Sequence, residues 1–412
     1  MRLLQWTLVL VVAGFLAWRM VVVNLSQLAI KTGGQASASE ALAWAPDNPL
    51  AQFYAAVDLM DSNPDEAERL LSKAIVNRPA DARLMAAYGL LLEQTGRGGR
   101  ATQAMDYAAQ LGPSQTPIQL ELAAFWGRRQ DLERYLTHLV AAMSLNANTW
   151  QKLNPILLAQ LEPPGSATVA RKVLSQALAD RDHRWWPAFF AYAVRHAKNL
   201  DVLRLLYSIR RQSSSPPADR ERIAFLLRLE RAGEWLEAYF IWLNSLGTSA
   251  LGHMGNLFNG GFEAPLLNEG FGWRTVEHPH VEVDAVATDG VVGRMAMRLS
   301  YRKLVNPVVP VSQYLLLPSG PYEFDGRVRV DDLRAEEGVR WQLRCVDERQ
   351  IIWQSESFKN SMSWRSFGGR FDVPADACMV QQLSMVVASP KNEEWGITGT
   401  LWFDDLHIRS LE

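Results

Sequence analysis

Prolines recur at nearly constant intervals early in the chain. They stand at positions 46, 79 and 113, which gives spacings of 33 and 34 residues. Proline ends a helix because it lacks the amide proton that the next turn needs. Each of the two later prolines is preceded by a pair of alanines at the same two distances, which predicts stacked helix pairs of about 34 residues that cross closely at these alanines. The alanines are Ala67, Ala74, Ala101 and Ala108.

The period resembles that of the tetratricopeptide repeat family. Tyr88-Gly89 stands where the first helix of such a repeat carries its small contact residue. Asn63, followed by Pro64 and Glu66, indicates a helix start, because its side chain can accept hydrogen bonds from the free amides. A degenerate third unit covers 116–147, and six further helices are expected up to residue 246. The resemblance implies an α-solenoid over 46–250.

In arrays of this family, the first helix of each repeat lines a groove that binds a protein partner. The lining transferred to this chain has both charge signs and no cluster of Lys and Asn, so the resemblance implies an internal segment or helix of a partner. The aromatic run 185–190 is interpreted as core, with an exposed partner anchor as the alternative. The predicted partner contacts are Gln52, Arg83, Leu90, Glu93, Gln94 and Arg128.

The N-terminus contains an apolar run over 3–23 that only Arg19 interrupts. About 20 apolar residues suffice to cross a bilayer. A cleaved signal peptide would need small residues at both the −3 and −1 positions, and Phe15 before Ala17 fits this poorly. We therefore expect an uncleaved transmembrane signal anchor over 1–24, followed by a stalk and a first helix over 25–45.

The pattern changes to a period of two after Gly252. Over 294–301, for example, Met, Met, Leu and Tyr alternate with Arg, Ala, Arg and Ser. About ten short strands are expected, the first at 257–263, with Gly and Pro between them. This pattern predicts an all-β sandwich over 252–412, of a length that suits a jelly roll. The predicted fold class is therefore multidomain: a transmembrane helix, an all-α solenoid and an all-β sandwich.

Four short motifs in this half resemble the galactose-binding-like jelly roll of carbohydrate-binding modules attached to xylanases and laminarinases. The resemblance implies an exported location and a sugar ligand, so the bulk of the chain is expected in the bacterial periplasm. A packing module without a sugar ligand is the alternative. The motifs are Asn259-Gly260-Gly261-Phe262-Glu263, Pro318-Ser319-Gly320-Pro321-Tyr322, Trp364 with Phe371 and Pro374, and Trp402-Phe403-Asp404-Asp405-Leu406.

Asp404 is the most informative single residue of the last motif. In a regular strand it would share a face with Trp402 and Leu406. A carboxylate on an apolar face must be paired or must bind a metal. The resemblance implies a structural calcium held by Asp404 and Glu263 together with backbone carbonyls. A hydrogen bond to Asp404 from a nearby backbone amide or an arginine is the alternative.

Tryptophans and histidines offer further candidate sites. Trp395 lies in a polar loop and is the first choice for a glycan contact, whereas Trp341 alternates with apolar residues and is expected in the core. The alternating series His278, His280, Glu282 and Asp284 is interpreted as a solvent-facing strand rather than a metal site. Cys345 and Cys378 are either two free thiols or one disulfide.

The chain carries a net charge of −2, which argues against a nucleic-acid partner. It has no phosphate-binding glycine loop and no nucleophile-elbow motif, so no enzyme activity is expected. We interpret it as a membrane-anchored exported adaptor whose array docks a protein and whose jelly roll binds glycan, in the assembly or secretion of a bacterial exopolysaccharide or other surface polysaccharide. A structural assembly factor of an inner-membrane complex, with no sugar ligand, is the alternative.

Overall fold

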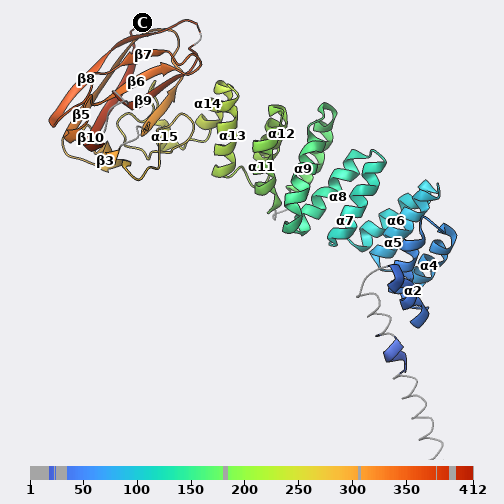
Figure 1. Cartoon of the computed structure of the whole chain (residues 1–412). Coiled ribbons are helices and arrows are strands. Elements are labelled where there is room, and N and C mark those ends of the chain that lie inside the picture. Colours follow the sequence, from blue (N-terminus) through green and yellow to red (C-terminus); the bar gives the residue numbers. More distant parts are fainter. Residues whose placement is uncertain are drawn as a thin grey trace, which may run out of the picture. The chain divides into compact units, whose positions relative to one another are not determined.

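The computed structural model describes residues 18–22, 24, 35–179, 184–304, 308–376, 378–388 and 396–411. The chain divides into two compact units, Met1–Glu221 and Arg222–Glu412 (Figure 1). The first unit is helical. The second begins within a helix and continues into two antiparallel β-sheets. The predicted order of an all-α array followed by an all-β sandwich is therefore confirmed.

Unit 1 consists of helices that pack in chain order as hairpins (Figure 1). Pro79 and Pro113 each follow the second helix of a hairpin, as the repeat pattern predicts. The helices are α2 (Gln35–Trp44), α3 (Pro49–Leu59), α4 (Pro64–Asn77), α5 (Ala82–Gln94), α6 (Gly98–Leu111), α7 (Thr116–Arg128), α8 (Leu132–Leu145), α9 (Trp150–Leu161), α10 (Ala167–Ala177), α11 (Trp185–His196) and α12 (Leu200–Gln212), with α13 (Asp219–Arg231) crossing into unit 2.

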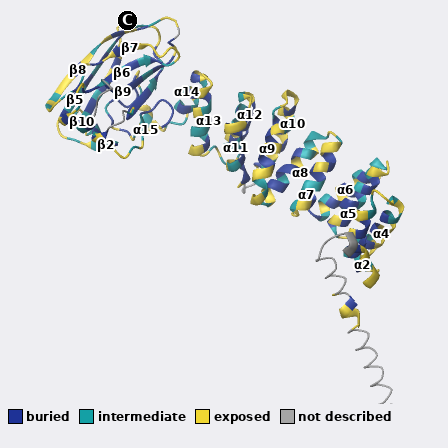
Figure 2. Ribbon diagram, in the orientation of Figure 1, coloured by how far each residue is buried: buried dark blue, intermediate teal, exposed yellow. Residues whose placement is uncertain are grey.

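The repeated alanines lie where the helices of a hairpin meet. Ala67, Ala74, Ala101 and Ala108 are fully buried, whereas the opposite sides of the helices are exposed (Figure 2). Gly89 of α5 serves the same purpose, because a Cβ placed there would come within 3.0 Å of a Met105 side-chain carbon on α6. Small residues at these positions allow the two helices of each hairpin to approach closely, and this packing recurs from one hairpin to the next.

Two local predictions in unit 1 are confirmed. The Asn63 side chain accepts a hydrogen bond from the Glu66 amide at 3.3 Å, and Pro64 begins α4. Trp185, Trp186, Phe189 and Phe190 are each at most 1% exposed, so the aromatic run is core. The alternative of an exposed partner anchor at 185–190 is therefore wrong.

The predicted transmembrane span over 3–23 lies almost entirely outside the described residues, which include only 18–22 of it. Within the described ranges, no helix is both long enough and apolar enough to cross a membrane. The anchor over 1–24 stays a prediction.

Unit 2 contains two five-stranded sheets. Sheet A has the order β1-β4-β9-β6-β7, and sheet B has the order β2-β3-β10-β5-β8. Every named pair of neighbouring strands is antiparallel. The strands are β1 (Arg274–Thr275), β2 (Val281–Ala287), β3 (Met295–Leu304), β4 (Val311–Leu315), β5 (Gly320–Arg334), β6 (Val339–Cys345), β7 (Ile351–Gln354), β8 (Met362–Val373), β9 (Gln381–Val387) and β10 (Ile397–Ser410).

Apolar residues from both sheets form one core between them. Alternation is clearest in β6, where Val339, Trp341, Leu343 and Cys345 point into that core and the intervening residues point outward. The expected first strand at 257–263 is wrong, because this segment forms turns. Asn259 and Phe262 have φ near +54° and +58°, a left-handed backbone conformation that no extended strand adopts.

Helix α14 of unit 2 packs against the sandwich. Trp242 of α14 (Trp235–Leu243) lies edge-on to Phe258 with ring centroids 5.1 Å apart, and Trp235 contacts Tyr314 of β4 at 5.0 Å. A short helix, α15 (Thr248–Leu251), follows α14 in the chain. Aromatic pairs of this kind contribute stability beyond the area that they bury.

Ion pairs with little solvent exposure join α13 to the start of the β region. Arg222 donates to Glu269 at 2.9 Å, and Arg274 of β1 donates to Glu230 at 2.5 Å. Burial raises the pKa of Glu230, and the Arg274 hydrogen bond partly offsets that rise. Removing one partner of such a pair would leave the other charge buried without compensation.

Cys345 and Cys378 form a disulfide. The bond joins the end of β6 to the segment that leads into β9, and both cysteines are at most 5% exposed. The alternative of two free thiols is therefore wrong. The bridge closes a segment of 33 residues that contains β7 and β8.

Breaking this bridge should destabilise the protein. For the full chain, replacement of both cysteines by Ser is expected to lower the free energy of unfolding by about 3–4 kcal/mol, because the unfolded chain regains the entropy of an open loop. Chemical denaturation with and without a reductant measures the effect, and the reductant should not affect the variant. Equal midpoints for wild type in both conditions would mean that the bridge is not formed in solution.

Candidate functional site

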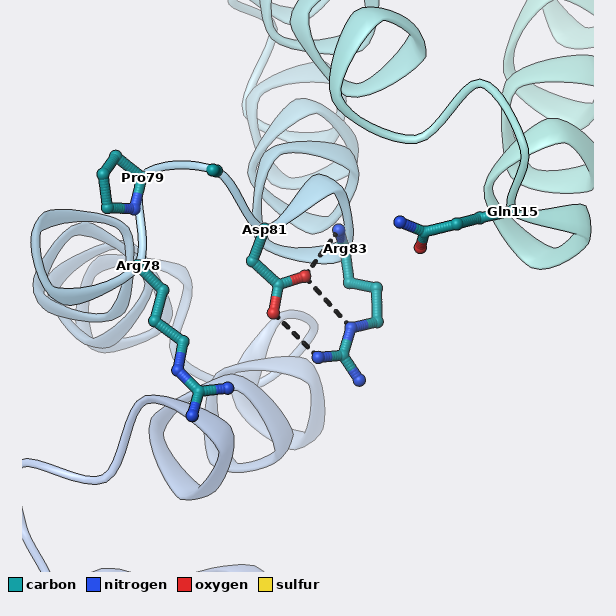
Figure 3. Close-up of a pocket in the computed structure, with 6 residues that line it drawn as sticks. Arg78, Pro79, Asp81, Arg83 and Gln115 are labelled. Atoms are coloured by element: carbon teal, nitrogen blue, oxygen red, sulfur yellow. Dashed lines mark hydrogen bonds and ion pairs between the residues drawn. The ribbon is translucent and has the colours of Figure 1, made fainter.

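The predicted partner groove has an exposed part around Arg83. This side chain donates two hydrogen bonds to Asp81, at 3.0 and 2.7 Å, and so closes the start of α5 (Figure 3). Beside it lies a hollow of about 510 Å³ at the α4–α5 turn, which is also lined by Arg78, Pro79 and Gln115. The prediction that Arg83 lies on an accessible surface is consistent with this position.

Three other predicted groove residues make contacts one repeat away. The Gln94 amide donates to Asp61 at 3.1 Å, and Arg128 donates to Glu93 at 3.0 Å. The sequence separations are 33 and 35 residues, close to one repeat. These side chains therefore form hydrogen bonds between neighbouring hairpins. Their contact with a partner stays a prediction.

Of the remaining two groove residues, burial contradicts the placement of Gln52, whereas the contact of Leu90 with a partner stays a prediction. Gln52 is 1% exposed and donates to the Pro46 carbonyl at 2.7 Å. Helix α2 packs on α3 there, with Ala41 against Ala51, so the first turns of α3 are not at an open surface. Leu90 is half-buried and packs against the core of the second and third hairpins. Gln52 therefore does not lie at an open groove surface.

Arg129, which the sequence interpretation did not select, makes more contacts with neighbouring residues than Arg128 does. It donates to Glu93 at 3.1 Å, to the Thr102 hydroxyl at 2.6 Å and to the Gly98 carbonyl at 3.0 Å. Its guanidinium also lies 4.3 Å from the centre of the Phe125 ring. The adjacent Arg128 makes one hydrogen bond and is half exposed.

Arg129→Ala is expected to lower the free energy of unfolding by about 1–3 kcal/mol, because several hydrogen bonds and a cation–π contact are lost together. Arg128→Ala is the matched control and should cost at most about 0.5 kcal/mol, as exposed pairs do. Urea denaturation of the full chain measures both. Equal losses for the two variants would show that Arg129 does not fasten the second hairpin to the third.

Asp404 lies on the opposite face from the one that the sequence interpretation gives it. Its partner across the ladder is Arg327, which is outside the core, whereas Phe403 pairs with Val328, which is inside it. Residues paired in this way share a face, so Asp404 points outward. The register shifts between Asp404 and His407, with Asp405 at φ near +53°, and this bulge returns Leu406 to the core.

Although it points outward, Asp404 is fully buried by the turn between β2 and β3. The turn's Val292 amide donates to Asp404 Oδ2 at 2.7 Å. At the end of the turn, the Arg294 and Met295 amides donate to Glu263 Oε1 at 2.6 and 2.8 Å. The two predicted calcium residues therefore hold the same turn, and the predicted alternative of a backbone hydrogen bond to Asp404 is present.

The pKa values of these two carboxyl groups shift in opposite directions. Burial raises the pKa of Asp404, and the two amides lower the pKa of Glu263. Asp404 Oδ1 is buried and has no hydrogen-bond partner. Such an oxygen fits a hard cation such as calcium, but the described residues bring no three His, Cys, Asp or Glu together, so backbone oxygens would have to complete the ligand set.

Calcium binding at Asp404 predicts that a chelator lowers the melting temperature of the full-length protein. Asp404→Asn, which keeps the size and shape of the side chain, should abolish that response. Differential scanning fluorimetry with EGTA and with added calcium measures it, and Asp325→Asn on the exposed part of the same sheet is the control. Identical melting temperatures of wild type with EGTA and with calcium would show that Asp404 binds no calcium and only accepts a hydrogen bond from the turn.

The outward face of sheet A is covered by long polar side chains. Arg340, Gln342 and Arg344 alternate with the buried residues of β6 and point outward. Gln354 of β7 and Gln382 of β9 stand beside them on the same face, because Gln354 pairs with Gln342 and Gln382 pairs with Arg344. The face therefore carries a continuous set of amide and guanidinium groups across three strands.

Hydrogen bonds within this set fix its geometry. The Gln354 amide donates to Gln342 Oε1 at 3.0 Å, and Arg340 donates to Gln354 Oε1 at 3.2 Å and to the Ala388 carbonyl at 3.1 Å. Two nitrogens of Arg344 donate to Gln382 Oε1, at 3.1 and 2.5 Å. We call these five residues, Arg340, Gln342, Arg344, Gln354 and Gln382, the polar platform.

The sequence interpretation missed the platform because it searched for aromatic glycan contacts. Its glycan residue, Trp395, lies outside the described residues. Trp341 is fully buried, as predicted. The alternation of Arg, Gln and Arg with Trp and Leu along 339–345 was the available signal.

In β2, Glu282 forms an ion pair with Arg302, and Asp284 forms one with Arg298 at 2.8 Å. Both carboxylates therefore stabilise the pairing of β2 with β3.

No family model and no curated protein matches this chain. Solved structures similar to it include a family 4 carbohydrate-binding module, at 17% identity over 37% of this chain and 99% of the module, with a TM-score of 0.30. The xylan-binding domain CBM22-1 of Paenibacillus barcinonensis is similar at 13% identity over 37% of this chain and 92% of that domain, with a TM-score of 0.26. The repeat protein PilF of Pseudomonas aeruginosa is similar at 17% identity over 57% of this chain and 100% of its own, with a TM-score of 0.32.

Proposed function

We propose that this chain is a membrane-anchored, exported adaptor without catalytic activity. Its β-sandwich binds a glycan, and its helical array docks a protein partner. We place it in the assembly or secretion of a bacterial exopolysaccharide or other cell-surface polysaccharide. The single observation that carries the glycan role is the polar platform of sheet A.

Hydrogen-bonded side chains on a rigid sheet suit the recognition of sugar hydroxyls. A hydroxyl both donates and accepts, and the amides of Gln342, Gln354 and Gln382 offer both functions. Because the platform residues hold one another in place, little side-chain entropy is lost when a ligand binds. The strands beneath the platform are fixed by the sandwich core, which keeps the groups in register.

Two features support export and anchoring. The apolar run over 3–23 has the length of a membrane span. The Cys345–Cys378 disulfide is typical of oxidising compartments such as the periplasm. A periplasmic location with an inner-membrane anchor accommodates both features.

Partner docking rests on the architecture of the array. Stacked helical hairpins create an extended surface, and Arg83 lies exposed on it beside the hollow at the α4–α5 turn. An internal segment or helix of a partner protein remains the proposed occupant. Glu93, Gln94 and Arg128 are bound within the array, so a partner would contact them only at their remaining hydrogen-bonding positions.

A structural assembly factor without a sugar ligand is the second candidate. Leu236 and Phe240 of α14 are 54% and 57% exposed, and they line a hollow of about 280 Å³ together with Tyr314 of the sandwich. Exposed apolar side chains beside a hollow favour protein contact. In this second candidate, unit 2 would bind protein at α14 and would not bind polysaccharide.

Glycan binding by full-length protein in detergent separates the two candidates. We expect retention on an array of neutral and acidic bacterial polysaccharides. Gln342→Ala combined with Gln354→Ala should weaken it about fivefold or more, since each lost hydrogen bond is worth about 0.5–1.5 kcal/mol. Ser300→Ala with Thr400→Ala, on the outward face of sheet B, is the control. Absence of binding to every polysaccharide would favour the assembly factor.

A further inference from the structure

The two sheets of the sandwich differ sharply in charge. None of the five strands of sheet A contains Asp or Glu. The strands of sheet B contain nine such residues: Glu282, Asp284, Glu323, Asp325, Asp331, Asp332, Asp372, Asp404 and Asp405. Sheet A nevertheless carries three arginines, of which Arg274 is bound to Glu230 and the other two lie in the polar platform.

Arg340 and Arg344 have only neutral partners among the described residues. Their hydrogen bonds go to the amide oxygens of Gln354 and Gln382 and to the Ala388 carbonyl. In addition, Arg340 Nε is buried without a hydrogen-bond partner. Asp347 and Glu348 stand in the turn beyond the end of β6, and no ion pair joins them to either arginine.

Three arginines on the other sheet are neutralised in a way that these two are not. On the outward face of sheet B, Arg298, Arg302 and Arg409 each lie within 3 Å of a carboxylate oxygen. Among the described residues, acids lie on the outward face of sheet B and not on the platform, where two positive charges are therefore held in place. Such charges attract anions, and a planar guanidinium binds a carboxylate through two parallel hydrogen bonds.

We propose that the polar platform binds an acidic polysaccharide, one whose sugars carry carboxylates, and not a neutral glycan. This inference rests on the proposed glycan-binding function and names its ligand class. Arg340 and Arg344 each take a carboxylate, and Gln342, Gln354 and Gln382 take hydroxyls. Four residues of one strand span about 13 Å, so the two arginines engage acidic groups on different sugar units of one polymer.

A protein ligand fits this surface less well. Protein interfaces are centred on buried aromatic or apolar anchors in pockets. The platform consists of amides and guanidinium groups, and Tyr314, the aromatic that the described residues place on its face, is covered by Trp235 and by Arg274 at 4.7 Å. Two aliphatic side chains share this face, Ile351 opposite Arg344 and Val386 opposite Arg340, but charged and hydrogen-bonding groups outnumber them, which favours a hydroxyl-rich acidic polymer.

The test measures binding of the full-length protein to polygalacturonate, alginate and hyaluronate, each beside its carboxyl-reduced neutral form. We expect at least one acidic polymer to bind tenfold or more tightly than its reduced form, with affinity that falls as salt increases. Arg340→Gln combined with Arg344→Gln should remove that preference, so that the acidic polymer binds this variant no more tightly than its reduced form does. Arg302→Gln combined with Arg409→Gln removes the same charge from sheet B and should leave both affinities unchanged.

The outcomes separate this inference from the function on which it rests. Equal binding of acidic and reduced polymers, or binding of neutral polysaccharides alone, overturns the acidic specificity while the glycan function stands. Absence of binding to every polysaccharide overturns both. Binding of poly-glutamate as tightly as the best polyuronate would show a general polyanion surface and would also overturn the inference. Arg340→Lys with Arg344→Lys keeps the positive charge but not the paired guanidinium donors, so it should retain part of the preference. Circular dichroism verifies that each variant is folded.

Discussion

The helical hairpins that the structure describes leave an apolar side that neighbouring elements cover, and the rest of the structure depends on this contact. Within unit 1, each hairpin is covered by the next, with Ala67, Ala101 and Gly89 allowing the close approach. At the N-terminal end, α2 covers α3. In unit 2, Trp235 and Trp242 of α14 are covered by aromatic residues of the sandwich. The sandwich thus does for α14 what a further hairpin would do in a longer array.

Polar side chains have two separate tasks in this protein. In the array, Glu93 with Arg129 and Asp61 with Gln94 connect residues about one repeat apart, so their charge and hydrogen-bonding capacity are used internally. On sheet A, Arg340 and Arg344 are held by neutral partners, and no carboxylate among the described residues compensates their charge. Internal pairing contributes to stability, whereas fixed but uncompensated charge is available to a ligand. This difference separates the scaffold from the candidate site.

Much of the fold could be predicted because its signals are local. Prolines at 79 and 113 mark helix ends, Asn63 marks a helix start, and strict alternation marks β6. The errors arose where distant segments decide the outcome. Helix α2 packs on α3 beside Gln52, and a bulge at Asp405 places Leu406 in the core although Asp404 faces outward. The platform also escaped prediction, because β6, β7 and β9 come together only through the sheet order.

Amide hydrogen exchange of the full-length protein tests the central claim most directly, because it locates the ligand without any substitution. Spectra with and without a bound acidic polysaccharide are compared strand by strand. The account predicts that added protection is confined to 339–345, 351–354 and 381–387, the strands that carry the polar platform. Protection confined to the strands of sheet B or to α14, with none on these three strands, would contradict it.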